Sequence, residues 1–472
     1  MVDSDSSTSK PDLNNPDSSR NSGNQAGTLP APATAPAHPG ARNGDIRLFA
    51  LADLHSPYRT LSRLLRAVRD AIADRDKPTA IVINGDIFER GNAAALRSAG
   101  AADWQFVEAL SALAPLIINI GNHETAIVDD LADFVARAET IGATVIGNIV
   151  DRRTGSLFAR PSARLTLAGH RIAFMGLAAT NPFVYRDAVR HTLGLVEPVG
   201  YARSVFDACM ADADVPVVVS HAGIVADRAI LPTLPDGTLV IGGHDHLCLD
   251  YRQSRSRYLH GGSWGNALSV IDIAVDASGP RYDAHLIPIT ADMPADDALE
   301  TAIADILATH LSASDREIIA RMPVSRNLAE SALMATRAVR QTAGADIAFL
   351  GHTTFGAGLA AGPLTRYDFD TFVRFDGAIL TADISGRTLA GIMDGANQHR
   401  ATALDAFTGD FVYAESIDVD PSARYRIATN DWIATNQRAY LGTDGIAFQP
   451  LDDVRLKESV ERFVATQAAA QT

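Results

Sequence analysis

"LVIGGHDHLCL", residues 239–249, starts as an apolar run of strand length and then changes abruptly to polar residues. His244, Asp245 and His246 follow a pair of glycines, at a point where packing alone gives no reason for them. Glycine lets the chain turn sharply at the end of a strand, and histidine is a common metal ligand. The stretch predicts a buried strand that ends in ligands, with Asp245 pointing away as a spacer between the two histidines.

Four other apolar runs end in the same way: "LFALA", "AIVIN", "LIINI" and "VVVS". They alternate with segments of helical periodicity, which indicates buried sheets covered by helices in a layered α/β domain. Because the carboxyl ends of strands in such sheets form the crevice where ligands bind, side chains far apart in sequence are expected to converge there. The polar residues that follow the four runs are Asp53, His55, Asp86, Asn122, His123, Glu124 and His221.

The mixture of oxygen and imidazole donors indicates first-row divalent cations such as Zn²⁺, Mn²⁺ or Fe²⁺. It is too rich in nitrogen for a Ca²⁺ or Mg²⁺ site. Seven ligands exceed the needs of one tetrahedral zinc ion, so we expect them to hold two ions with one aspartate bridging. Such a pair clamps an in-line displacement, and phosphoester hydrolysis is the reaction that most needs it. The seven candidates are Asp53, His55, Asp86, Asn122, His221, His244 and His246.

The ordered set "DLH", "GD", "GNHE", "SH" and "GGHDH" resembles the signature of the calcineurin-like metallophosphoesterases. The layout is similar to the 5′-nucleotidase branch, which implies a layered α/β/β/α sandwich joined to a second, smaller α/β domain. The resemblance implies that His123 assists the leaving group and that Glu124 orients it; the branch has an aspartate where this chain has Ala126. It also implies that Asp53, His55 and His246 hold one metal ion, that Asn122, His221 and His244 hold the other, and that Asp86 bridges.

Composition and the resemblance together divide the chain into four parts. Residues 1–44 are rich in Ser, Asn, Pro, Ala and Gly and are expected to be a disordered tail. Residues 45–290 are the expected metallophosphoesterase domain, and residues 291–325 an Ala-rich helical connector. Residues 326–472 resemble the C-terminal substrate domain of the 5′-nucleotidases.

Two stretches of this last part resemble the substrate-contacting segments of the branch. "GDFVY" implies that Phe411 stacks on a base. "YLGTDGIAF" implies a second stacking ring at Tyr440 and a polar contact from Asp444. Two aromatic faces sandwich a purine or another flat group. Both rings are equally consistent with ordinary core aromatics.

The phosphate-contacting loop departs from the branch. The branch has an Asn-Gly-Gly-x-Arg run, whereas this chain has "GHTTFG", with His352 and Thr353 as the polar contacts and Gly356 where the arginine would fall. Histidine and threonine can hydrogen-bond a phosphate but lack the bidentate fork of arginine. Arg366, Arg374 and Arg387 are the alternatives that could replace it.

These features predict a two-metal phosphoester hydrolase that acts on nucleotides, either a 5′-nucleotidase or a cyclic-nucleotide phosphodiesterase. The "GHTTFG" loop motivates an alternative substrate, a non-nucleotide phosphoester or a sulfur analogue. A non-catalytic metal-binding sensor is the third hypothesis.

Composition limits the partners and the location. The formal net charge is −15 with no long Lys/Arg run, which argues against binding a nucleic-acid polymer. Two cysteines in 472 residues exclude a disulfide framework. No apolar run reaches the roughly 20 residues that span a bilayer. The first residues lack the pattern of a signal peptide, so we expect the protein to lie in the cytoplasm, without membrane attachment. Its expected partner is a small-molecule phosphoester.

Overall fold

The computed structural model describes residues 45–73 and 77–469. The tail predicted for residues 1–44 lies outside this range. Among the helices of the described residues, none is both long enough and apolar enough to cross a membrane.

The first sheet has six strands in the order β14-β13-β1-β2-β3-β4. Strands β1 to β4 are parallel to one another; β13 pairs antiparallel with β1, and the edge strand β14 pairs antiparallel with β13. Ala52 of β1 pairs with Asn84 of β2, which pairs with Asn119 of β3, so these three strands end at one level. The strands are β1 (Ile46–Ala52), β2 (Thr79–Asn84), β3 (Leu116–Asn119), β4 (Thr144–Ile146), β13 (Ala267–Asp276) and β14 (Gly279–Pro288).

The second sheet also has six strands, in the order β11-β12-β10-β9-β7-β6. Strands β7, β9, β10 and β12 are parallel, whereas β6 and β11 are antiparallel edges. Ser220 of β9 pairs with Gly242 of β10, so the strand quoted first ends level with its neighbour. The strands are β6 (Ser162–Leu167), β7 (His170–Ala178), β9 (Val215–His221), β10 (Leu239–Gly242), β11 (Cys248–Gln253) and β12 (Ser256–Gly261).

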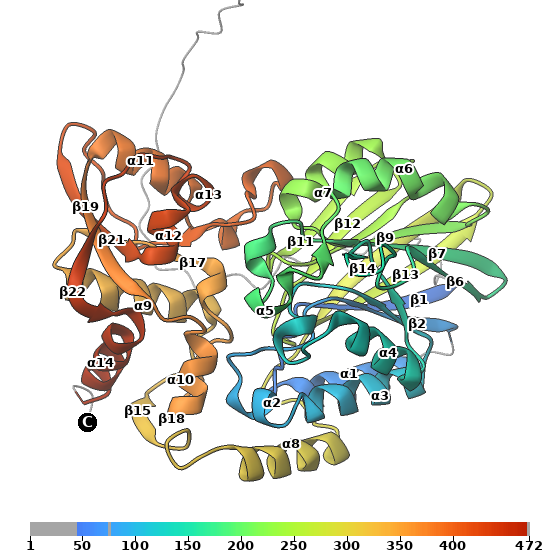
Figure 1. Cartoon of the computed structure of the whole chain (residues 1–472), viewed down its shortest axis with the longest axis horizontal. Helices are drawn as coiled ribbons and strands as arrows, with labels where there is room; N and C mark the ends of the chain where they lie inside the picture. The colour runs from blue at the N-terminus through green and yellow to red at the C-terminus, as the bar shows by residue number, and fades with distance from the viewer. Residues whose placement is uncertain (1–44, 74–76, 470–472) are drawn as a thin grey trace, which may run out of the picture. The chain divides into compact units, whose positions relative to one another are not determined.

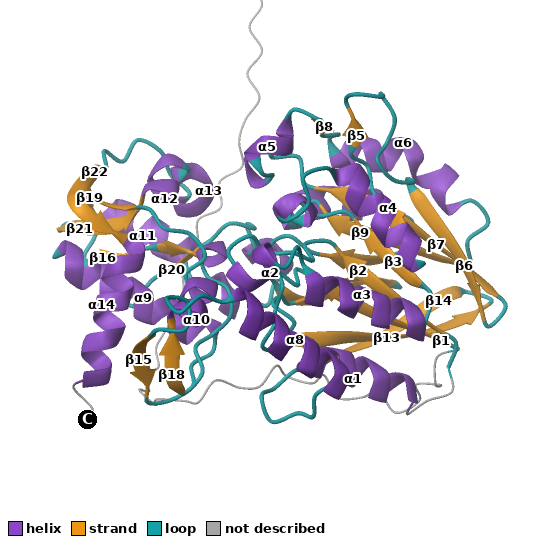
Figure 2. Cartoon of the chain, turned by 60° about the horizontal axis from the view of Figure 1, so that its bottom comes forward, coloured by secondary structure: helices purple, strands orange, loops and turns teal. Residues whose placement is uncertain are grey.

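The two sheets pack face to face and carry helices on their outer sides (Figures 1 and 2). Leu48, Val82, Phe174, Val217 and Ile241 belong to the apolar layer between the sheets, and each is at most 3% exposed. The predicted layered α/β/β/α architecture is confirmed. The outer helices are α1 (Leu61–Ala73), α3 (Ala101–Leu113) and α4 (Leu131–Ile141) on the first sheet, and α6 (Pro198–Met210) and α7 (Ile224–Ile230) on the second.

Short elements interrupt the loops of this part of the chain. Strands β5 and β8 pair antiparallel, and the short helices α2 and α5 lie between longer elements. They are β5 (Val150–Asp151), β8 (Leu193–Gly194), α2 (Ala93–Arg97) and α5 (Asp187–Arg190).

The segment predicted as a helical connector contains a strand as well as a helix. Helix α8 (Asp297–His310) is followed by β15 (Ile318–Met322), which pairs antiparallel with β18 (Gly362–Thr365). The strand forms because Ala320 and Met322 alternate with outward residues and are buried. The domain boundaries at residues 290 and 325 stay predictions.

The C-terminal part is a second α/β unit around the sheet β16-β21-β19-β22. Helix α9 begins with a capping box between Asn327 and Glu330 and ends at Ala343, where Gly344 caps it with a φ of 56°. "ADIAFLG" is split into two short strands that join different sheets. The elements are α9 (Leu328–Ala343), β16 (Ile347–Ala348), β17 (Leu350–Gly351), α10 (Arg366–Phe372), β19 (Ala378–Ser385), α11 (Gly386–Gly395), β20 (Val412–Tyr413), β21 (Arg424–Asn430), α12 (Asp431–Thr435), α13 (Gln437–Leu441), β22 (Gln449–Arg455) and α14 (Leu456–Ala469).

Candidate metal centre

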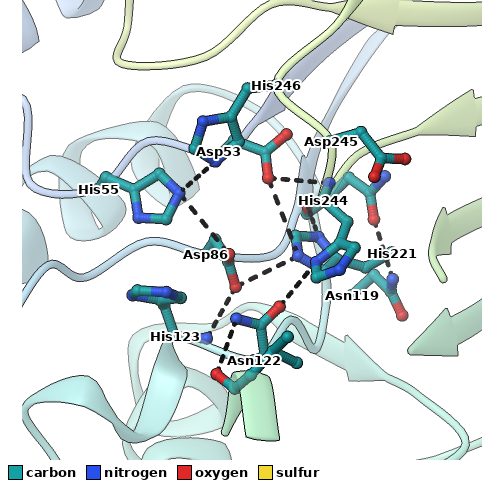
Figure 3. A network of polar contacts seen from close by, with 12 residues as sticks. Asp53, His55, Asp86, Asn119, Asn122, His123, His221, His244, Asp245 and His246 are labelled. Atoms are coloured by element: carbon teal, nitrogen blue, oxygen red, sulfur yellow. Dashed lines mark hydrogen bonds and ion pairs between the residues drawn. The ribbon is translucent and has the colours of Figure 1, made fainter. Parts of the chain in front are cut away.

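The ends of five strands bring all seven candidate ligands to one place (Figure 3). They come from the turns after β1, β2, β3 and β10 and from the last residue of β9. Left-handed backbone is uncommon outside glycine and clusters at functional sites, where the surrounding structure enforces it. Five of the seven candidates have a positive φ: Asp53, His55, Asp86, His244 and His246.

One group of donors comprises Asp53, His55 and His246, whose nearest donor atoms all lie within 4.8 Å of one another. The two imidazole Nε2 atoms of His55 and His246 are 2.9 Å apart and buried. Asp53 Oδ1 accepts a hydrogen bond from His244 N at 2.9 Å, which fixes the carboxylate. An aspartate and two histidines so arranged are a typical donor set for a first-row divalent cation.

A second group comprises Asp86, His221 and His244, again within 4.8 Å of one another. Asn122 adds an amide oxygen, since its Oδ1 lies 2.9 Å from His244 Nδ1. His221 Nδ1 donates to Asn84 O at 2.8 Å. A carbonyl oxygen can only accept, so this bond places the Nδ1 proton and leaves Nε2 facing the centre.

Asp86 lies between the two groups. Its Oδ2 is 3.6 Å from His55 Nε2 and its Oδ1 is 3.2 Å from His221 Nε2. The side chain of Asp86 also groups with His55 and His123 within the same 4.8 Å limit. One carboxylate thus reaches both donor groups.

The ionisation of the imidazoles suits cation binding. Burial lowers the pKa of His55 to about 4 and, together with the charge of His221, that of His244 to about 4. Burial also holds the pKa of His246 well below its ordinary value. Three of the four imidazoles are therefore neutral at pH 7 and offer a lone pair, as metal ligation requires.

Asp86 and the fourth imidazole, His221, carry opposite charges that compensate each other. Burial raises the pKa of Asp53 to about 8. Burial acts the same way on Asp86, but the neighbouring imidazoles of His221, His123 and His55 together outweigh it and hold that pKa well below its ordinary value. Burial lowers the pKa of His221, but the surrounding carboxylates, Asp86 first among them, raise it to about 10. His221 Nε2 and His246 Nδ1 are buried and have no hydrogen-bond partner among the described residues, so the donor set fits a divalent cation.

Asp245 points away from the centre, as predicted. Its Oδ2 accepts a hydrogen bond from Ile224 N at 2.5 Å at the start of α7. His244 and His246 on either side of it face inward (Figure 3).

His123 lies at the edge of the centre, where its backbone N donates to Asp86 Oδ1 at 2.7 Å. Its ring meets His55 edge to face at 4.6 Å and is 19% exposed. The prediction that Glu124 orients this ring is wrong: Glu124 Oε1 accepts from Ile87 N at 3.2 Å. The carboxylate that faces His123 Nδ1 is Glu89, at 3.8 Å. Glu124 starts a 3₁₀ helix, whose turn directs its side chain towards the loop after β2. Adjacency in sequence to His123 was therefore a poor guide to its contact.

Two of the residues expected to bind substrate lie in the "GHTTFG" loop beside the metal centre. His352 is buried; its Nε2 lies 3.4 Å from His246 O and its Nδ1 lies 2.9 Å from Tyr413 Oη. Thr353 is half-buried, and its carbonyl accepts from Arg374 at 3.1 Å.

The expected aromatic sandwich is not formed. Phe411 is 0% exposed, and its ring stacks on His352 at 4.4 Å with an interplanar angle of 18°. Tyr440 is also buried, and its hydroxyl accepts from Trp432 Nε1 at 3.1 Å. Asp444 is exposed on the surface, where it pairs with Arg438. Imidazole packing therefore fills the face of Phe411 that a base would need.

Sequence reasoning missed two residues of the centre, Glu89 and Trp264. Trp264 stacks on His55 at 5.1 Å with an interplanar angle of 21°. Glu89 lies three residues after Asp86 in "GDIFERG", and this spacing was the available signal. Arg374 was named only as an alternative anion contact, and it instead bonds Glu89 at 2.6 Å.

Comparison with known proteins identifies the family of this centre. The model of the calcineurin-like phosphoesterases matches residues 46–248, which contain all seven candidate ligands. The matched segment belongs to the calcineurin-like phosphoesterases. The model of the 5′-nucleotidase C-terminal domain matches residues 313–414. This phosphoesterase is therefore a metal-dependent phosphoester hydrolase of the predicted branch.

Solved structures share its fold at low sequence identity. A 5′-nucleotidase precursor from Thermus thermophilus superposes with a TM-score of 0.60 at 17% identity, covering 90% of this chain and 96% of that one. A sulfate thiohydrolase SoxB from the same organism gives 0.63 at 15% identity, with 91% and 95% covered. A 5′-nucleotidase from Candida albicans gives 0.59 at 13%, with 90% and 99% covered. No curated protein gives a significant sequence match.

Proposed function

We propose that this phosphoesterase holds two divalent cations and hydrolyses a small-molecule phosphoester rather than a nucleic-acid polymer. The observation that carries the proposal is the position of Asp86, whose two oxygens reach His55 and His221 on opposite sides. Asp86 would bridge the two ions. Asp53, His55 and His246 would hold one ion, and Asn122, His221 and His244 the other.

The two metal ions would be Zn²⁺, Mn²⁺ or Fe²⁺, because the donor set mixes imidazole nitrogen with oxygen. When bound, such cations polarise phosphoryl oxygens and make water a nucleophile near neutral pH. The chain itself supplies the rigid frame. His221 is held by Asn84 O, and Asp53 by the backbone of His244, so both are oriented before substrate arrives.

His123 would donate a proton to the leaving oxygen. Its ring reaches the edge of the centre and is 19% exposed, whereas His55 and His221 are fully enclosed. Glu89, facing Nδ1, would hold the proton there and leave Nε2 as the group that exchanges with substrate.

Nucleotides are the first substrate class, from the family of both matched segments. The burial of Phe411 favours a second candidate, a compact phosphoester or a sulfur analogue that brings no base to stack. With a compact ester, His352 and Thr353 would contact the anion rather than a sugar.

The test loads purified protein with each of the three metals and measures hydrolysis of AMP, cyclic nucleotides, sugar phosphates, p-nitrophenyl esters and a sulfate-ester analogue. Asp86→Asn should lower turnover by at least about 10³-fold with an unchanged circular dichroism spectrum, because both ions lose a charged ligand. Asp305→Asn, at an exposed carboxylate of helix α8, is the matched control and should behave as wild type.

Metal binding without hydrolysis of any ester would favour the sensor hypothesis instead. Wild-type turnover in Asp86→Asn would contradict the proposed centre. Preference for AMP over compact esters would decide for the nucleotide, and the reverse order for the second candidate.

A further inference from the structure

Glu89 is not one of the seven candidate ligands, yet its carboxylate makes several polar contacts beside the metal centre. Its Oε2 lies 3.3 Å from His55 Nδ1 and 3.8 Å from His123 Nδ1. The same oxygen accepts from Arg374 Nη2 at 2.6 Å and from Arg374 Nε at 3.0 Å. Its Oε1 accepts from Gly91 N at 2.8 Å. One carboxylate thus joins a candidate metal ligand, the candidate proton donor and an arginine from a distant segment.

The loop that carries Glu89 is anchored on both sides. Ile87 and Phe88 before it are at most 1% exposed and pack in the apolar core. The backbone N of Glu89 donates to Ser56 Oγ at 3.0 Å. The backbone is therefore fixed, and the remaining freedom of the carboxylate is rotation about its own side-chain bonds.

Arg374 is held as firmly from the other side. It follows α10, its backbone N donates to Thr354 O at 3.0 Å, and its Nη1 donates to Thr353 O at 3.1 Å. Its guanidinium lies over the Trp264 ring at 5.3 Å, and that ring stacks on His55 at 5.1 Å. Arg374 therefore reaches His55 by two routes, through the Glu89 carboxylate and through the Trp264 ring.

We propose that Arg374 is a positioning residue for the metal centre: it fixes Glu89 so that this carboxylate sets the ring orientation of His55 and His123. The inference rests on the proposed two-metal function. A carboxylate against Nδ1 selects the tautomer that leaves Nε2 free to ligate a cation, and outer partners of this kind commonly govern metal affinity about 10–100-fold. The planar fork of arginine can hold one carboxylate oxygen with two N–H groups, which lysine cannot do.

The C-terminal segment would then contribute to the metal centre of the N-terminal one. Arg374 lies 285 residues from Glu89 and falls in the segment matched by the 5′-nucleotidase C-terminal model. That segment would thus complete the metal centre in addition to contacting substrate. The first segment alone would carry all seven ligands without the contact that orients two of its imidazoles.

The experiment titrates Mn²⁺ into metal-free full-length protein by calorimetry and compares wild type with Arg374→Gln, Arg374→Lys and Glu89→Gln. Arg59→Gln is the matched control, since Arg59 pairs with Asp368 of helix α10, just before Arg374 in the chain, but does not reach Glu89. Arg374→Gln and Glu89→Gln should weaken Mn²⁺ binding at least about tenfold, Arg374→Lys by a smaller factor, and Arg59→Gln by less than twofold. Thermal unfolding of each metal-free protein separates this effect from a loss of fold.

Wild-type Mn²⁺ affinity and stoichiometry in folded Arg374→Gln would overturn the inference. If Arg374→Gln does not fold, Arg374→Lys decides: weakened binding supports the inference and wild-type binding overturns it. An equal loss in Arg59→Gln would also overturn it, because any link to α10 would then suffice. Failure of the wild-type protein to bind Mn²⁺ is a different result, which removes the proposed function and the inference with it.

Discussion

Replacing Gly85 with alanine should damage the protein more than the backbone angle alone explains. Gly85 connects β2 to Asp86 with φ +71°, and a Cβ there would lie 2.6 Å from His221 Nδ1 and 2.7 Å from both the Cα and the N of Gly121. Gly155 is the matched control, with φ +76° and no described atom within 4 Å of its Cβ position. Left-handed backbone costs a non-glycine residue roughly 1–2 kcal/mol at either site. Crowding of a closely packed site adds roughly 1–3 kcal/mol.

We therefore expect Gly85→Ala to lose about 2–5 kcal/mol of unfolding free energy and Gly155→Ala about 1–2 kcal/mol. The crowding at Gly85 involves backbone of Gly121, and the His221 ring is tied to Asn84 O, so neither neighbour can move aside freely. Urea denaturation of the metal-free proteins gives the two free energies, and Mn²⁺-dependent ester hydrolysis should fall at least about tenfold in Gly85→Ala alone. Equal stability of the two variants, with wild-type hydrolysis in both, would refute the close approach at the strand ends.

Two further predictions concern His123 and Asp103. His123→Asn should lower kcat by about 10²–10⁴-fold for an alkyl phosphate. The loss should be much smaller for p-nitrophenyl phosphate, because its leaving group needs no proton, and Mn²⁺ affinity should be unchanged. An equal loss on both esters would contradict the proton-donor role. Burial raises the pKa of Asp103 to about 7 despite the Tyr58 hydroxyl donating to it at 2.9 Å. The folded state then holds a proton that the unfolded state releases above about pH 4, so this group's contribution to stability should fall by about 1.4 kcal/mol per pH unit as pH rises towards 7. Asp103→Asn should lack that slope in urea denaturation between pH 5 and 7, and parallel pH profiles would contradict the assignment.

The strand ends could be predicted from the sequence because parallel buried strands must end together. Once the apolar runs before Asp53, Asp86 and Asn122 were recognised, the sheet that they form dictated that their following residues meet. Side-chain direction within the turns was less accessible. Glu124 follows His123 directly, yet the 3₁₀ turn points it towards Ile87, and Glu89 faces the ring instead.

Packing between distant segments could not be predicted at all. Phe411 carries the same sequence signal whether its ring is free or covered by His352, and only the tertiary contact distinguishes the two. Arg374 gave no signal that set it apart from Arg366 or Arg387, since its partner lies 285 residues away. Strand β15 was hidden for a similar reason, because its short apolar alternation gains a partner only from β18.

The central claim is that seven side chains from five strand ends bind two cations with Asp86 between them. Anomalous diffraction at the manganese edge, from crystals of the Mn²⁺-loaded protein, tests it most directly. We expect two peaks about 3.5–4 Å apart, one beside His55 and His246 and the other beside His221 and His244. A single peak, or peaks away from Asp86, would contradict the two-metal centre.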